Sequence, residues 1–76
     1  MLYTKINEQI VKALPDAVVE LDDYRHDGLH ILVKVTSRQF EGLALLAQHR
    51  LVHNALKSLM ETGEIHAVKI QTKVPE

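Results

Sequence analysis

The fold of this chain is decided by the stretch Thr36-Ser37-Arg38-Gln39-Phe40-Glu41-Gly42, followed by Gln48-His49-Arg50-Leu51-Val52-His53 and then by Ile65-His66-Ala67-Val68. The first segment predicts a short helical turn over residues 37–41, with Ser37 as its N-cap and Gly42 as its end. The second segment lies within the longest predicted helix, residues 43–62. The third opens a predicted strand, residues 65–72.

The apolar residues support both of these longer elements. One stripe at helical spacing is formed by Leu45, Val52, Leu56 and Leu59 or Met60, and we expect it to face the core. Gly63 stands where a residue with positive φ commonly ends a helix. Side chains along the strand alternate, so His66, Val68 and Ile70 share one side, and Ala67, Lys69 and Gln71 share the other.

A helix and two strands are predicted ahead of that stretch. Residues 4–14 carry apolar side chains at helical spacing, with Thr4 as the N-cap and Pro15 after the last turn. Residues 17–22 and 29–36 alternate as strands do, and the second strand places Ile31, Val33 and Val35 on one face. The polar segment between them contains Asp27-Gly28, a dipeptide typical of turns.

The predicted order is α-β-β-α-α-β, an α+β fold in one small domain, residues 1–76. A short loop joins the first two strands, which should be antiparallel. Helices join the second and third strands, which should be parallel, so the sheet is mixed and three-stranded with the helices on one face. Parallel strands begin at one edge, so the loop with Arg25, His26 and Gly28 should lie close to His66.

Composition excludes several classes of function. The chain has 76 residues, no cysteine and a net charge of −1, which rules out disulfides and argues against general affinity for nucleic-acid phosphates. It contains no apolar run near the ~18 residues of a membrane span and no leader pattern, which favours a cytoplasmic protein, although a processed organellar protein would share this composition. Glycine-rich phosphate loops and an activated nucleophile are absent, so an enzyme is not expected.

Three motifs in this order resemble the signature of the BolA family. That signature reads S-x-x-F-x-G, then R-H-R-x-V-Y, then I-H-A-L, and the segments quoted above follow it at similar spacing. The resemblance extends over residues 6–72 and implies a fold like the type II KH domain, with a helix-turn-helix-like pair in the middle. The chain departs from the signature at Gln48, where relatives have Arg, and at His53, where they have Tyr.

The resemblance implies a ligand role for His66, which occupies the position of the family's C-terminal histidine, a ligand of an iron–sulfur cluster. Relatives offer a Cys or His in the loop before the second strand, and in this cysteine-free chain His26 is the candidate there. His30 ranks lower, because alternation places it on the sheet face opposite His66. Without the resemblance, His66 reads as a structural histidine and His26 as a solvated loop residue.

The long helix carries the residues expected to meet a partner. His49 and Arg50 match the family's central H-R pair, and with Arg38 and Lys57 they are the predicted contacts to a partner protein or to nucleic acid. His49 and His53 also have the i, i+4 spacing of metal ligands on a helix. The H-E-x-x-H pattern and a third ligand are missing, so a zinc site is not expected there.

The expected function is a non-enzymatic adaptor in iron–sulfur cluster assembly, trafficking or sensing. As the resemblance implies, the protein would pair with a monothiol glutaredoxin and share a [2Fe-2S] cluster, with the glutaredoxin cysteine and glutathione supplying thiolates. The alternative is a DNA-binding transcription regulator that uses the helix-turn-helix-like face, which Gln48 deprives of one positive charge. A metal-free interaction module and a homodimer remain open.

Overall fold

The computed structural model describes residues 2–27 and 30–76. Its elements are α1 (Leu2–Ala13), β1 (Val18–Asp22), β2 (His30–Thr36), the 3-10 helix η1 (Arg38–Phe40), α2 (Leu45–Glu61) and β3 (Ala67–Lys73). The order is the predicted one, with the first helix of the middle pair reduced to the single turn of η1. None of the helices in residues 2–27 and 30–76 combines the length and apolar character that a membrane span needs.

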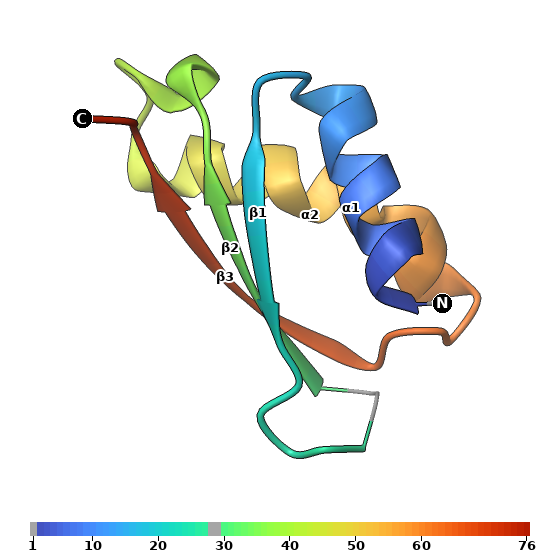
Figure 1. Cartoon of the computed structure of the whole chain (residues 1–76). Helices are drawn as coiled ribbons and strands as arrows, with labels where there is room; N and C mark the ends of the chain where they lie inside the picture. The colour runs from blue at the N-terminus through green and yellow to red at the C-terminus, as the bar shows by residue number, and fades with distance from the viewer. Residues whose placement is uncertain (1, 28–29) are drawn as a thin grey trace.

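The strands form one sheet in the order β1-β2-β3. β1 is antiparallel to β2, and β2 is parallel to β3, with His30 opposite Ala67 and Thr36 opposite Lys73. This confirms the predicted mixed sheet and leaves β1 and β3 as its two edges. Both α-helices lie on one side of the sheet (Figure 1). The predicted first residue of the second strand, Leu29, lies outside the described residues, as does Gly28.

The core lies between the sheet and the two helices. Its fully or almost fully buried apolar side chains are Ile6, Ile10, Leu14, Ile31, Val33, Val35, Phe40, Val52, Leu56, Leu59 and Ile65. The opposite face of the sheet is largely polar, with Glu20, Lys34 and Lys69 exposed, although it also carries the exposed Val18. One-sided burial of this kind produces a clean alternation along each strand, which is why the buried faces of the strands were predicted correctly.

Asp16 and Ser37 fasten the turn after α1 to the beginning of η1. The fully buried Ser37 donates its hydroxyl to Asp16 Oδ1 at 2.7 Å and accepts from Gln39 N–H at 3.1 Å. Arg38 N–H donates to Asp16 Oδ2 at 2.7 Å. The hydrogen bonds from Ser37 and then Arg38 hold the pKa of Asp16 below its usual value. The predicted N-cap role of Ser37 is confirmed.

Several predicted boundaries differ from the structure, and one predicted core residue is exposed. α1 begins at Leu2, so Thr4 lies inside the helix and is not its N-cap. β3 begins at Ala67, where pairing with β2 begins, and not at residue 65. Leu45 is the first residue of α2 and is 63% exposed, so its predicted place in the core is wrong. The end of α2 agrees with prediction, because Gly63 follows the C-cap with φ of 80°.

Candidate metal and partner site

The starts of β2 and β3 lie at the same end of the sheet, as parallel pairing requires. His30 is paired with Ala67, and neighbouring strands are about 4.8 Å apart. The loop between β1 and β2 and the bend before β3 therefore both reach this end of the sheet, which is its lower end in Figure 1. His26 belongs to the loop and His66 to the bend, so the topology brings the two segments that carry the predicted ligands to the same end of the molecule.

His66 lies in the bend between α2 and β3, and its side chain is exposed. The residue before it, Ile65, is buried and donates its N–H to the carbonyl of Leu59 at 3.3 Å. Because β3 begins at Ala67, strand alternation does not fix the side to which His66 points. The exposed imidazole is accessible to a second molecule at the end of the sheet where both strands begin.

Glu64 holds the bend that carries His66 against α1. Its carboxylate binds Lys5 of α1 and accepts the hydroxyl of Thr62 at 3.0 Å. The bond from Lys5, followed by that from Thr62, lowers the pKa of Glu64 from its usual value. The path of the chain into β3 is thus fixed on both sides of His66, by this contact and by the pairing of Ala67.

His26 occupies a tight turn in the β1–β2 loop. Its φ of 56° makes it the single non-glycine residue with positive φ in the described part of the chain. Its N–H donates to the carbonyl of Asp23 at 3.0 Å, and the N–H of Asp27 donates to Asp23 Oδ1 at 3.2 Å. For a non-glycine residue the left-handed conformation costs about 1–2 kcal/mol, which the turn has to offset. The exposed imidazole takes no part in these bonds.

His30, the alternative ligand, is engaged within the protein. Its Nδ1 lies 2.8 Å from Asp27 Oδ2, and its N–H donates to Asp27 Oδ1 at 3.1 Å. Its ring meets Tyr24 edge to face with the ring centres 6.5 Å apart, and Lys69 Nζ lies 4.8 Å from the Tyr24 ring centre. Because Ile31 points into the core, His30 belongs to the polar face of the sheet. These contacts support ranking it below His26.

The predicted ligands do not make a complete metal site within the described part of the chain. Residues 2–27 and 30–76 contain no group of three or more His, Cys, Asp or Glu placed to hold a metal ion. His26 and His66 offer imidazole nitrogens, which are suitable ligands for iron, and the chain has no cysteine. A cluster held here would need its remaining ligands from another molecule.

The predicted partner contacts separate into two groups. His49 and Arg50 line a shallow hollow of about 330 Å³ between α2 and β3, together with His53, Val68 and Ile70. Arg38 lies on η1, and Lys57 lies farther along α2 with its Nζ 3.9 Å from Glu61 Oε1. Neither of the latter two lines the hollow. The sequence did not predict this hollow, because nothing in it indicates how α2 sits over the edge of β3.

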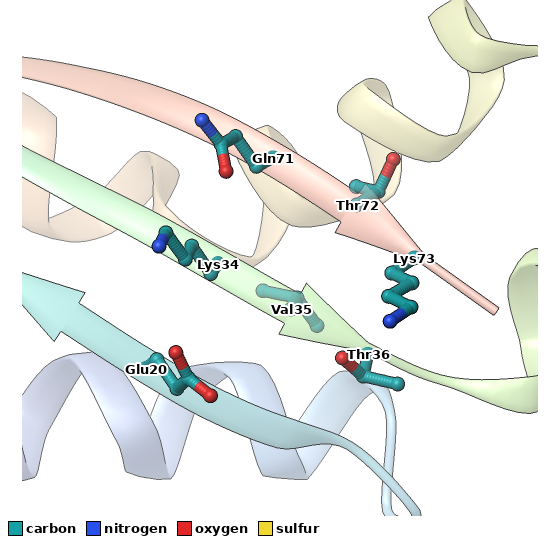
Figure 2. Close-up of a pocket in the computed structure, with 7 residues that line it drawn as sticks. All are labelled: Glu20, Lys34, Val35, Thr36, Gln71, Thr72 and Lys73. Atoms are coloured by element: carbon teal, nitrogen blue, oxygen red, sulfur yellow. The ribbon is translucent and has the colours of Figure 1, made fainter. Parts of the chain in front are cut away.

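A second hollow, of about 360 Å³, lies over the sheet near the ends of β2 and β3 (Figure 2). It is lined by Glu20, Lys34, Val35, Thr36, Gln71, Thr72 and Lys73. Figure 2 shows these side chains coming from all three strands. The alternation of the strands predicted a polar face but not its hollowed shape.

Comparison with known proteins follows the motifs. The sequence profile of the family described as BolA-like protein matches residues 8–76. A BolA-like protein of Dictyostelium discoideum is 35% identical over 81 aligned residues, which cover 97% of this chain and 71% of the relative.

Solved structures agree with the sequence comparison. BolA1 from Arabidopsis thaliana superposes with a TM-score of 0.86 at 34% identity and covers 99% of this chain and 93% of its own. The BolA domain of SufE1 from Arabidopsis thaliana gives a TM-score of 0.81 at 32% identity, over 95% of this chain and 89% of that domain. These likenesses extend over almost the whole chain and include all three motifs, so the chain belongs to the BolA family.

Proposed function

We propose that this protein is a non-enzymatic adaptor that binds a monothiol glutaredoxin and shares a [2Fe-2S] cluster with it through His66 and His26. The observation that carries the proposal is that the two segments bearing these exposed histidines lie at the same end of the sheet, where β2 and β3 begin. Membership of the BolA family supports it, since the family signature puts a cluster ligand at the position of His66.

The incomplete donor set supports sharing between two molecules. Two imidazoles from this chain leave half of the cluster's coordination to a partner, and a glutaredoxin cysteine with glutathione would supply thiolates there. Neutral imidazole in place of thiolate raises the reduction potential of a [2Fe-2S] cluster, as in Rieske-type centres. The task of this chain is then to hold two imidazoles in place, through the His26 turn and through the bend anchored by Glu64 and Lys5.

A domain of this kind also occurs inside a longer protein. This chain covers 23% of the length of SufE-like protein 1 of Arabidopsis thaliana, at 28% identity. A BolA domain that works beside another module of the same chain is consistent with an adaptor, whose activity depends on what it is joined to.

Anaerobic reconstitution tests the proposal. The protein is mixed with a monothiol glutaredoxin, glutathione, ferrous iron and sulfide, and the cluster is followed by visible absorption and circular dichroism. We expect a spectrum that differs from that of the glutaredoxin alone, and His66→Ala and His26→Ala should each change it. His53→Ala is the matched control, since it removes an exposed histidine of α2 and should leave the spectrum as it is.

The variants separate the two ligand assignments. If His66→Ala changes the spectrum while His26→Ala does not, the loop assignment is wrong and His30→Ala is tested next. If the glutaredoxin spectrum is the same with and without this protein, the adaptor proposal is wrong. An interaction without metal would then be sought by pulldown with the glutaredoxin, and DNA binding by salt-dependent mobility shifts.

A further inference from the structure

We propose that the free edge of β3, with the hollow beneath α2, is a docking site for an extended segment of another protein in which acidic and apolar residues alternate. This site begins beyond His66, uses neither His66 nor His26, and needs no metal. It therefore goes beyond the adaptor function proposed above and can be tested without iron.

The first observation is the backbone of β3. β3 is an edge strand of seven residues, and within residues 2–27 and 30–76 its one partner strand is β2. The carbonyl of Lys73 accepts from Ser37 N–H at 3.0 Å, so the backbone groups of Lys73 face the β2 side. Backbone groups alternate in direction along a strand. The N–H and C=O groups of Val68, Ile70 and Thr72 therefore face the open edge, where another strand can bind them.

The second observation is the hollow beside that edge. Val68 and Ile70 are half-buried and form its apolar floor, while His49, Arg50 and His53 of α2 stand over it. A strand added to β3 would lie about 4.8 Å farther out. Every second side chain of that strand would enter the hollow on the helix side of the sheet. The hollow of about 330 Å³ has room for apolar side chains at these positions.

The apolar surface continues past the hollow along α2. Leu45 and Leu46 lie one helical turn before His49 and Arg50, on the same side of the helix. Both leucines are 63% exposed. They extend the apolar surface beyond the end of the hollow. A role in docking would account for an apolar residue at Leu45, which the sequence pattern placed in the core.

The third observation is the charge around this edge. β3 carries Lys69 and Lys73 and no acidic residue, and the side of α2 that lines the hollow carries Arg50. Lys73 Nζ has Glu76 at 3.8 Å, whereas the described residues place no carboxylate beside Lys69 or Arg50. Lys69 belongs to the open face of the sheet. Acidic side chains on the positions of an added strand that alternate with the apolar ones would meet it there.

The same charges argue against a second copy as the occupant. Pairing β3 with β3 of another copy would place four lysines in one ribbon with no acidic residue on either strand, and neighbouring like charges destabilise a sheet. Lysine on an edge strand is a common protection against such self-pairing. A strand with the opposite charge pattern is not excluded in this way and would be attracted.

The experiment uses the full chain, labelled with 15N, and short synthetic peptides in iron-free buffer. The panel has the pattern Glu-X-Glu-X-Glu-X-Glu, with X as Val, Ile, Leu or Phe. Control peptides carry Lys in place of Glu or Pro in place of the central X. We expect the acidic peptides to shift the amide resonances of Val68, Ile70 and Thr72 and to protect them from hydrogen exchange. The free edge of β1 should remain unaffected.

Two charge-reversal variants locate the binding. Lys69→Glu should weaken the acidic peptides by about tenfold, since an attraction becomes a repulsion. Lys12→Glu makes the same charge change on the exposed surface of α1 and should leave binding unchanged. Both lysines are exposed, so both variants should fold, which the amide spectrum checks directly.

The opposing results are equally definite. The proposal is wrong if no peptide of the panel shifts β3 at millimolar concentration, or if the Lys and Pro control peptides bind as well as the acidic ones. Sedimentation showing that this edge is closed by a second copy would also overturn the choice of occupant. Because no iron is present, none of these results depends on whether the cluster proposal holds.

Discussion

At the scale of single residues, one hydrogen-bonded pair joins parts of the chain that are far apart. Ser37 caps η1, and its hydroxyl also reaches the carboxylate of Asp16, which in turn accepts the N–H of Arg38. The cap was predictable, because a serine stood just before a short helical turn. Its partner was not, because Asp16 lies 21 residues earlier and nothing local shows that the two segments meet.

Replacing Ser37 should destabilise the domain. Ser37→Ala removes the cap and leaves the buried end of η1 without its hydroxyl, so we expect the free energy of unfolding to fall by about 1–2 kcal/mol. Urea unfolding measures this loss. Ser58→Ala, on the exposed surface of α2, is the matched control and should lie within about 0.5 kcal/mol of the wild type.

The same pair predicts the direction of the pH dependence. The pKa of Asp16 is lowered in the folded protein, mainly by Ser37, so the charged carboxylate stabilises the fold. That contribution is fully present above the unfolded value of about 3.9 and is lost as the pH falls through the lower folded pKa.

Asp16→Asn should therefore flatten the acid limb of the stability curve. Thermal unfolding midpoints between pH 7 and pH 2.5 make the comparison. The variant should be less stable than the wild type at pH 7 and should approach it at the acid end. Some slope should remain, because the pKa of Glu64 is lowered as well. Parallel curves for the two proteins would show that Asp16 makes no such contribution.

At the scale of the elements, the periodicity of α2 identifies which side of the helix is buried but not how far along the helix the burial extends. Val52, Leu56 and Leu59 are buried as predicted, whereas Leu45 continues the stripe and is exposed. A periodic pattern extends through the first turn of a helix whether or not another element covers that turn. Tertiary packing decides the matter: the buried Phe40 of η1 lies beside the first turns of α2, where its carbonyl accepts from Gln48 Nε2 at 3.4 Å, while Leu45 is left exposed.

Two leucines of the same helix should consequently respond very differently to truncation. Leu56→Ala removes a fully buried side chain and should cost about 2–5 kcal/mol. Leu45→Ala should change stability by no more than about 0.5 kcal/mol, since it removes little buried surface. Denaturant unfolding of both variants decides this. Similar losses for the two would mean that Leu45 is covered after all.

At the scale of the whole molecule, the candidate site depends on the topology of the sheet. The order of helices and strands was sufficient to predict that the loop before β2 and the start of β3 lie at the same end of the sheet. A crossover between parallel strands returns the chain to the end where the first of them began. The resemblance to the family then supplied His66, and the lack of cysteine left His26 as the loop candidate. The hollow between α2 and β3 was not predictable, because it depends on how the helix lies over the free edge of the strand.

The central claim, that this chain supplies histidine ligands to a shared cluster, is tested most directly by pulsed electron paramagnetic resonance. The protein is labelled with 15N-histidine, combined with unlabelled glutaredoxin and glutathione, reconstituted with iron and sulfide, and reduced. The account predicts 15N couplings of directly bound nitrogen, one of which disappears in His66→Ala and another in His26→Ala. A reduced cluster that shows no 15N coupling from this chain would contradict the account.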